Sequence, residues 1–216
     1  MNDRHKGRMT DEVIQMALSR VGLYRLFSRL FRYEIDDELF DKLQSPPLRE
    51  TLESLGLQLP LDTDNHELLQ TLAEEYTWLF VGPGKHLPPY ASVQKKPGAG
   101  LLNGPETAAV RRFIKGTGFK FNDSFKDYPD HISAEFEYME TLVQREHDAL
   151  ISDDIVEAEH SRTIQKNLFE EHMDIWIPQY CELVLDNAKH SFYQQLAVST
   201  SKFLALERDL LIQTTT

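Results

Sequence analysis

Two side chains that can do chemistry, Asp130 and His131, stand next to each other directly after Pro129. A helix dipole lowers the pKa of an imidazole at a helix start, and an exposed His131 ring there can hydrogen-bond a bound guest. The residues alone also allow a local role, which is the commoner one, in which Asp130 caps the helix and His131 packs. Glu135 follows His131 by four residues and therefore shares its helix face.

Acidic and histidine side chains do not form the pattern of a metal centre. A di-iron site in a helical bundle needs two Glu-x-x-His motifs and two further helical glutamates. The sequence has one match, Glu157–His160, and no second. The spacing between His131 and Glu135 arises often by chance. We therefore expect no metal site.

The Gly82–Lys85 segment has the glycines and the lysine of a phosphate-binding loop but not their arrangement. It lacks the four residues that separate the first glycine from the Gly-Lys pair in such a loop. It also has no Ser or Thr after the lysine, and it does not follow a predicted strand. Ser92 can meet His131 in space, but no nucleophile elbow surrounds Ser92. Neither segment therefore carries a recognisable catalytic motif.

The segment 81–92 is held on the end of a predicted helix. That helix has an apolar face made by Leu68, Leu69, Leu72, Tyr76, Leu79 and Phe80. Beyond it, glycines permit unusual backbone angles, while three prolines fix φ and remove donors. The result is a stiff loop that suits the gripping of another chain. Tyr90, directly after two prolines, offers a ring face to an apolar or guanidinium group.

A second interruption, Tyr128–Met139, reads as a turn followed by a helix start. Pro129 ends the preceding segment, and Asp130 is the expected N-cap. Both this turn and the 81–92 loop are rigid, proline-fixed interruptions of helices. We expect them to converge into one pocket.

Helical periodicity dominates the rest of the chain and predicts an all-α fold. One apolar stripe consists of Val13, Ile14, Ala17, Leu18, Val21, Tyr24, Phe27 and Phe31. Two further stripes lie at 132–150 and 192–210. Short helices are expected at 36–44, 47–55 and 104–115, with Pro178 interrupting or restarting a penultimate helix. The stretches 81–103 and 116–131 are expected to be irregular.

Composition excludes several classes of protein. The 216 residues carry a formal net charge of −12, from 23 basic and 35 acidic residues, which argues against nucleic-acid binding. No apolar run approaches the roughly 18 residues that a membrane span needs. The N-terminal segment lacks the apolar region of a secretory signal, and one cysteine allows no intrachain disulfide. We expect a cytoplasmic protein.

Together the 81–92 loop and the Tyr128–Met139 segment resemble the TorD/DmsD/NarJ family of cytoplasmic chaperones that mature molybdoenzymes. The resemblance is carried by Tyr76, Leu79, Phe80, Gly82, Pro83, Gly84, Pro88, Pro89, Tyr90 and Ser92, then by Pro129-Asp130-His131-Ile132 with Glu135 and Met139. Weaker matches lie at His172–Pro178 and Phe203–Glu207, so the resemblance covers residues 10–211. Tyr128 and Ala91 depart from the family pattern, where many members have an acidic residue, and these departures bear on the charge of the pocket.

The resemblance implies a TorD-like bundle of about nine to eleven helices that is not an enzyme. It implies a chaperone, acting in anaerobic respiration, that binds the twin-arginine signal peptide of the apo catalytic subunit of a molybdenum-cofactor oxidoreductase. Such binding holds the precursor back from export until the cofactor is inserted. We expect the peptide-binding site to consist of Trp78, Leu79, Phe80, Gly82, Pro83, Pro88, Pro89, Tyr90, Ser92, Asp130, His131 and Glu135.

The resemblance also implies a division into helical sets at 1–115 and 132–216, joined by a hinge at 116–131. Some members exchange their halves, so we expect a monomer or a domain-swapped homodimer. No cofactor is expected, although guanine-nucleotide binding has been proposed for relatives, and weak guanine-nucleotide binding remains an option without assigned residues. Two other function classes stay open: a small nucleotide hydrolase using the Gly82–Lys85 loop, and an inert helical scaffold.

Overall fold

The computed structural model describes residues 2–58, 65–82, 84–95, 100–118 and 128–212. Within these ranges the chain forms ten α-helices and no strand, which confirms the all-α class. The helices are α1 (Asn2–Arg32), α2 (Asp37–Gln44), α3 (Pro46–Leu55), α4 (Asn65–Tyr76), α5 (Ala91–Gln94), α6 (Pro105–Gly116), α7 (Ile132–Ile151), α8 (Ile155–Leu168), α9 (Ile177–Asn187) and α10 (Ser191–Ile212). Two π-helical turns, η1 (Thr77–Val81) and η2 (Phe169–Met173), follow α4 and α8.

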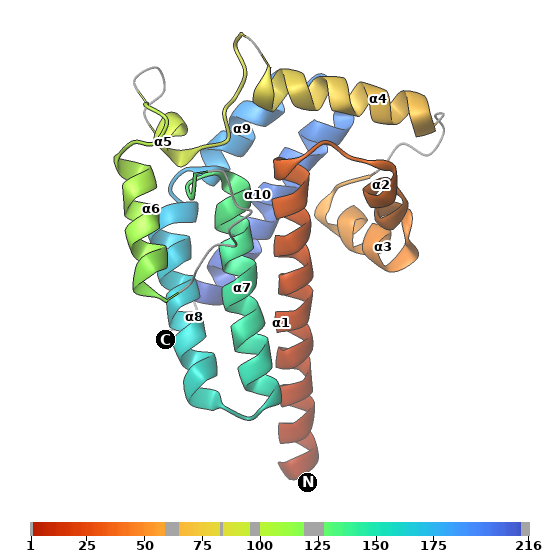
Figure 1. Ribbon diagram of the computed structural model, residues 1–216. Helices are drawn as coiled ribbons and strands as arrows, with labels where there is room; N and C mark the ends of the chain where they lie inside the picture. Colours follow the sequence, from red (N-terminus) through yellow and green to blue (C-terminus); the bar gives the residue numbers. More distant parts are fainter. Residues whose placement is uncertain (1, 59–64, 83, 96–99, 119–127, 213–216) are drawn as a thin grey trace.

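The long helices make the body of the molecule. α1 packs along α7 and α7 along α8, while α10 contacts both α8 and α9 (Figure 1). α2 and α3 lie on one side of α1, and α5 and α6 lie beyond α8 on the opposite side. The site-bearing segments are therefore supported at one end of this body, near the start of α7.

An aromatic cluster fills the core between α1, α7 and α10. Phe203 lies 4.8 Å from Tyr24 and 5.3 Å from Phe27 between ring centroids, and Phe136 packs against all three aromatic rings of α1. These residues are fully or almost fully buried. These rings of the predicted apolar stripes therefore meet in one shared core, where their burial stabilises the fold. Val13 and Leu18, which were predicted to belong to the α1 stripe, are exposed instead.

A buried charge network sits beside that core and joins four helices. Arg20 of α1 donates to Glu207 of α10 at 2.7 Å, to Glu146 of α7 at 2.9 Å and to Gln165 of α8 at 2.7 Å. Tyr24 donates to the other oxygen of Glu207 at 2.7 Å. Since each charge has a close partner, the network tolerates its burial.

Local sequence signals explain most helix ends. Asp36 caps α2 by accepting from the Leu39 N–H at 2.8 Å, and prolines occupy the first turn of α3. Gly56 ends α3 with a left-handed φ of 94°, a conformation that glycine adopts without strain. Pro178 lies in the first turn of α9, so it restarts a helix after η2.

Two expectations need correction or remain open. The stretch 81–103 is not wholly irregular, because Ala91–Gln94 forms the single turn α5. Most of the proposed hinge, at 119–127, lies outside the described residues. The division into two helical sets stays a prediction, and the buried core contains residues from both sets. No helix in the described part of the chain has the length and apolar character needed to cross a bilayer.

Candidate functional site

The two motif segments meet at the start of α7. The Ile132 N–H donates to the Pro89 carbonyl at 2.9 Å, and the Ala91 N–H donates to the Asp130 carbonyl at 3.0 Å. Tyr90 and His131 consequently form an isolated antiparallel bridge. The convergence expected from the two proline-fixed interruptions is present, as a direct backbone contact.

Side chains and prolines hold this junction in place. Pro89 has no N–H to donate, so its contribution to the junction is its carbonyl. The Leu87 carbonyl accepts from the Tyr180 hydroxyl at 2.9 Å, and the Pro88 carbonyl accepts from the Gln94 amide at 2.7 Å. The 84–95 segment is thereby attached to α9 and to its own helical turn.

The structure corrects the expected roles of Asp130 and His131. His131, not Asp130, is the N-cap of α7: its Nδ1 accepts from the Ser133 N–H at 3.1 Å. Asp130 is fully buried and accepts instead from the Ser92 N–H at 2.9 Å. The His131 ring is 6% exposed and packs edge-on against Tyr90 at 4.8 Å, so the expectation of an exposed ring is wrong in this structure.

Other predicted site residues are distributed between core and surface. Leu79, Phe80, Pro89, Ser92 and Glu135 are buried, whereas Pro88 and Tyr90 are half-buried. Gly82 closes η1, because its N–H donates to the Thr77 carbonyl and an added Cβ would lie 2.9 Å from that oxygen. Pro83 lies outside the described residues.

Trp78 is the exposed aromatic residue of the predicted set. Its side chain is 43% exposed, and the Lys189 ammonium lies 4.2 Å from the ring centroid. Trp78, Lys189 and His190 line a hollow with residues of α4, and none of these residues lines the cavity beside Glu135 described next. The structure therefore does not bring Trp78 into the junction itself.

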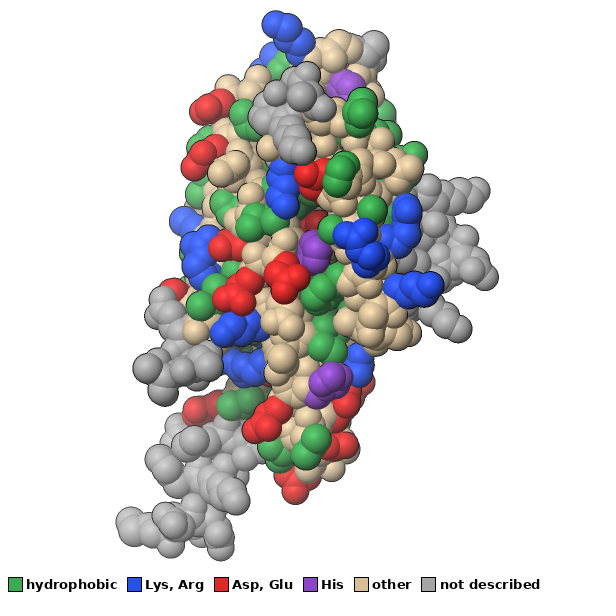
Figure 2. Space-filling model, turned by 90° about the vertical axis from the view of Figure 1, so that its left-hand side faces the viewer, with side chains coloured by type: hydrophobic (Ala, Val, Ile, Leu, Met, Phe, Trp, Pro, Cys, Tyr) green, Lys and Arg blue, Asp and Glu red, His purple; other side chains and the backbone are tan. Residues whose placement is uncertain are grey.

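A polar cavity of about 330 Å³ opens beside the junction. Its lining comes from α5 and the residue after it, from α6, from α7 and from η2: Ala91, Lys95, Pro105, Glu106, Ala109, Val110, Arg112, Glu135, Glu171 and His172. Figure 2, which faces the side of the molecule where α6 lies, shows acidic and basic side chains interspersed over this surface. The mouth of the cavity thus carries both signs of charge.

Buried polar atoms without a protein partner gather around this region. In the described part of the chain they include Ser92 Oγ, Thr107 Oγ1, Asp130 Oδ1, Glu135 Oε1 and His172 Nε2. An unpaired buried polar atom is unfavourable by about 1–3 kcal/mol, and native proteins contain few. Sequence reasoning selected Ser92, Asp130 and Glu135 but assigned no role to Thr107 or His172.

Glu135 and His172 are electrostatically unusual members of this group. Complete burial raises the pKa of Glu135 well above its usual range; the hydrogen bond from Trp176 Nε1 at 3.0 Å opposes this effect, and the nearby Asp130 carboxylate adds to it. Burial also lowers the pKa of His172. Both shifts favour the uncharged forms. Within the described residues, no group of three or more His, Cys, Asp or Glu side chains is arranged to hold a metal ion.

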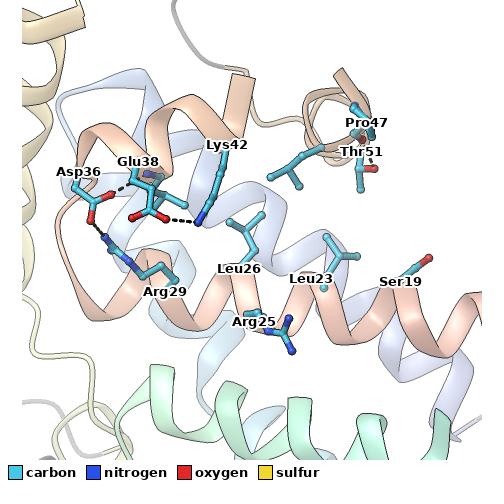
Figure 3. Close-up of a pocket in the computed structure, with 13 residues that line it drawn as sticks. Ser19, Leu23, Arg25, Leu26, Arg29, Asp36, Glu38, Lys42, Pro47 and Thr51 are labelled. Carbon is cyan, nitrogen blue, oxygen red and sulfur yellow. Dashed lines mark hydrogen bonds and ion pairs between the residues drawn. The ribbon is translucent and has the colours of Figure 1, made fainter. Parts of the chain in front are cut away.

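A third and larger hollow lies between α1, α2 and α3 (Figure 3). It measures about 650 Å³ and has the apolar side chains of Leu23, Leu26, Leu39 and Leu48 among its lining. Ion pairs at its edge join Arg29 to Asp36 and Lys42 to Glu38. Sequence reasoning missed this groove, although Leu23 and Leu26 fall outside the main apolar stripe of α1 and were a signal for a second apolar face.

Comparison with known proteins places the chain in a family. The model of the nitrate reductase delta subunit family matches residues 41–182. The chain belongs to this family. The resemblance to TorD/DmsD/NarJ chaperones inferred from the motifs is thereby confirmed.

Relatives of the family align over nearly the whole chain. A protein named Chaperone protein TorD from Vibrio vulnificus (strain YJ016) is 25% identical over 221 residues, covering 94% of this chain and 100% of the relative. A protein of the same name from Shewanella loihica (strain ATCC BAA-1088 / PV-4) is 26% identical over 210 residues, covering 89% and 93%. The family match includes η1, the 84–95 segment and the start of α7, so the junction lies within it.

Proposed function

We propose that this chain is a molybdoenzyme-maturation chaperone that binds the twin-arginine signal peptide of an apo catalytic subunit. It keeps the precursor from export until its molybdenum cofactor is inserted. The observation that carries the proposal is the junction: two family motifs, distant in sequence, are joined by backbone hydrogen bonds beside a polar cavity. The family match and the relatives named chaperones support it.

The chemistry of the guest complements what the chain offers. A twin-arginine peptide carries two guanidinium groups followed by an apolar region. The chain has a formal net charge of −12, which attracts a basic segment over a distance of about a Debye length. Half-buried Tyr90 and exposed Trp78 provide ring faces for apolar or guanidinium groups. Because the client supplies the redox chemistry, the proposed function needs no catalytic residue here.

Calorimetry on four synthetic signal peptides tests this function. The peptides carry either two arginines or two lysines, combined with either leucines or serines in the apolar region. The peptide with arginines and leucines is called the native peptide below. We expect the apolar region to contribute most, because burial of two leucine-sized side chains supplies roughly 3–6 kcal/mol before ordering costs, against about 0–1 kcal/mol for each exposed ion pair. The peptides with serines in the apolar region should lose most of their affinity. The peptides with two lysines in place of the arginines should lose a modest part of it. Binding should have a negative ΔCp.

The same experiment distinguishes the proposed function from an inert scaffold and from binding that is mainly electrostatic. Absence of binding to the native peptide would overturn the proposed function and favour an inert scaffold. Binding that physiological salt abolishes, with no effect of the serine changes, would overturn the dominance of the apolar contact. Weak guanine-nucleotide binding and a monomer or domain-swapped homodimer stay predictions. Titration with GTP and a mass measurement in solution test them.

A further inference from the structure

The cavity between α6 and α7 has buried polar atoms that the described protein groups leave unpaired. Glu135 contributes Oε1 from α7, and His172 contributes Nε2 from η2. The other oxygen of Glu135 is fixed by the Trp176 indole at 3.0 Å, so the carboxyl group has one defined orientation. These two side chains are 0% and 8% exposed. They make a preorganised wall able to accept hydrogen bonds.

The charges around the cavity select a cationic donor over an anion. Glu106 is half-buried and Glu171 exposed, and together with Glu135 they place three carboxyl groups in the lining. The basic residues Lys95 and Arg112 are both exposed, so water screens their charges, as it does that of Glu171. Once Glu135 has lost its proton, three carboxylates face two cations across the cavity, and this balance favours a bound cation over an anion.

A guanidinium fits this wall better than an ammonium ion. Its planar fork presents several N–H donors in fixed directions, and its hydration is weaker, so less free energy is needed to bring it into a buried site. A guanidinium can donate to Glu135 Oε1 and to a neutral His172 ring, whose Nε2 has no protein partner.

We propose, on the basis of the proposed function, that this cavity receives the guanidinium of one arginine of the twin-arginine signal peptide, with Glu135 as its buried carboxylate partner. The subsite lies next to the junction, because Ala91 both lines the cavity and donates its N–H to the Asp130 carbonyl. A peptide bound along the 84–95 segment therefore passes its mouth.

Binding of a guanidinium there is coupled to the release of a proton. Burial raises the pKa of Glu135 in the empty protein and so favours the protonated carboxyl group, whereas the arriving cation stabilises the carboxylate, and the displaced proton leaves to the buffer. Affinity should consequently increase as pH rises between the pKa of the complex and that of the empty protein. The charged and titratable groups that surround Glu135 are Lys95, Glu106, Arg112, Asp130, Glu171 and His172.

Calorimetry with the native peptide in two buffers of different ionisation enthalpy measures the protons released on binding. For the wild-type chain we expect net proton release on binding. Glu135→Gln keeps the shape of the side chain and an oxygen for the Trp176 indole but cannot ionise. It should bind about tenfold more weakly or worse, with proton release lost. The matched control is Glu140→Gln on the same helix, whose partner Arg25 is exposed; it should leave both quantities unchanged.

A second measurement keeps the wild-type chain and changes the peptide. Citrulline in place of each arginine in turn retains the shape and removes the charge, so one of the two peptides should lose proton release. This measurement tests the guanidinium subsite even if Glu135→Gln fails to fold. Binding with unchanged affinity and unchanged proton release in both arms would overturn the subsite while the proposed function stands. A wild-type chain that does not bind the native peptide would overturn both.

A competition experiment tests whether the cavity binds an anion instead of a guanidinium. Displacement of the native peptide by GTP or inorganic phosphate, with displacement lost in Arg112→Gln, would assign the cavity to anions and overturn the guanidinium subsite. We expect neither anion to displace the peptide at physiological salt.

Discussion

Asp130 Oδ2 accepts a hydrogen bond from the backbone N–H of Ser92 at 2.9 Å, and both residues are buried. This contact joins the first residues of α5 to the turn before α7. Asp130 therefore has a structural role, which is to position the 84–95 segment. Mutation of Asp130 tests this role.

Asp130→Ala should lower both stability and peptide affinity. The substitution leaves a buried N–H without its acceptor, which lowers the free energy of unfolding by about 1–3 kcal/mol. Affinity for the signal peptide should fall because the 84–95 segment loses a point of attachment. Chemical denaturation and calorimetry measure the two effects.

Asp154→Ala is the control for Asp130→Ala. Asp154 caps α8 by accepting from the Glu157 N–H at 3.0 Å at an exposed position. Its loss should lower the free energy of unfolding by about 1 kcal/mol and leave affinity unchanged. If both variants lost equal stability and neither lost affinity, the positioning role of Asp130 would be wrong.

Trp78→Ala should weaken peptide binding with little loss of stability. The ring is 43% exposed, and its cation–π contact with Lys189 supplies about 0.5–1 kcal/mol at most at such a site. An aromatic anchor at an interface commonly contributes about 2 kcal/mol or more to binding. Leu206→Ala, an exposed apolar truncation on α10, is the control. Equal affinity of the two variants would remove Trp78 from the peptide site.

Arg20→Ala should be among the most destabilising single changes in the chain. It leaves Glu146 and Glu207 buried without their shared cation, which lowers the free energy of unfolding by about 3–5 kcal/mol. Arg25→Ala removes an exposed arginine of the same helix and its pair with Glu140, and about 1 kcal/mol or less should be lost. Thermal melts of the two variants that coincide would contradict the structural role of the network.

Cys181 should resist thiol reagents until the protein unfolds. Its side chain is buried, and burial raises the pKa of the thiol from 9.0 to about 12. At pH 8 the thiol is therefore protonated and shielded, and labelling should follow unfolding in urea. Because the folded pKa is raised, the stability that this thiol contributes is present below its unfolded value of 9.0 and is lost as pH rises toward the folded value. Rapid labelling of the native chain would contradict both points.

Periodicity predicted the helices well because burial and helical spacing leave a direct trace in the sequence. The expected short helix at 47–55 became α3 at 46–55, with Gly56 as its end, since proline and glycine signal helix boundaries through backbone geometry. α5 was missed because a single turn of four residues has too few positions to show a period.

The candidate site was predictable in its parts and not in its geometry. Both motifs are proline-fixed interruptions of helices, which predicted that they converge, and they do. The N-cap was assigned to Asp130 because aspartate is the commoner cap, yet a tertiary partner, the Ser92 N–H, holds that carboxylate. His172 could not be chosen from the sequence, because its unpaired Nε2 is defined by neighbours from other helices.

The bond between Arg20 and Glu207 is also among the last contacts of α1 that can form during synthesis. The two residues are 187 positions apart, so Arg20 can pair with Glu146 of α7 before it meets Glu207, and the buried network is complete only after α10 has left the ribosome. Contacts of such long range slow folding, and the faces of Tyr24 and Phe27 that pack on Phe203 of α10 stay uncovered until then. A protein proposed to shield unfinished clients thus has a long unfinished phase of its own, in which its first helix needs protection from aggregation.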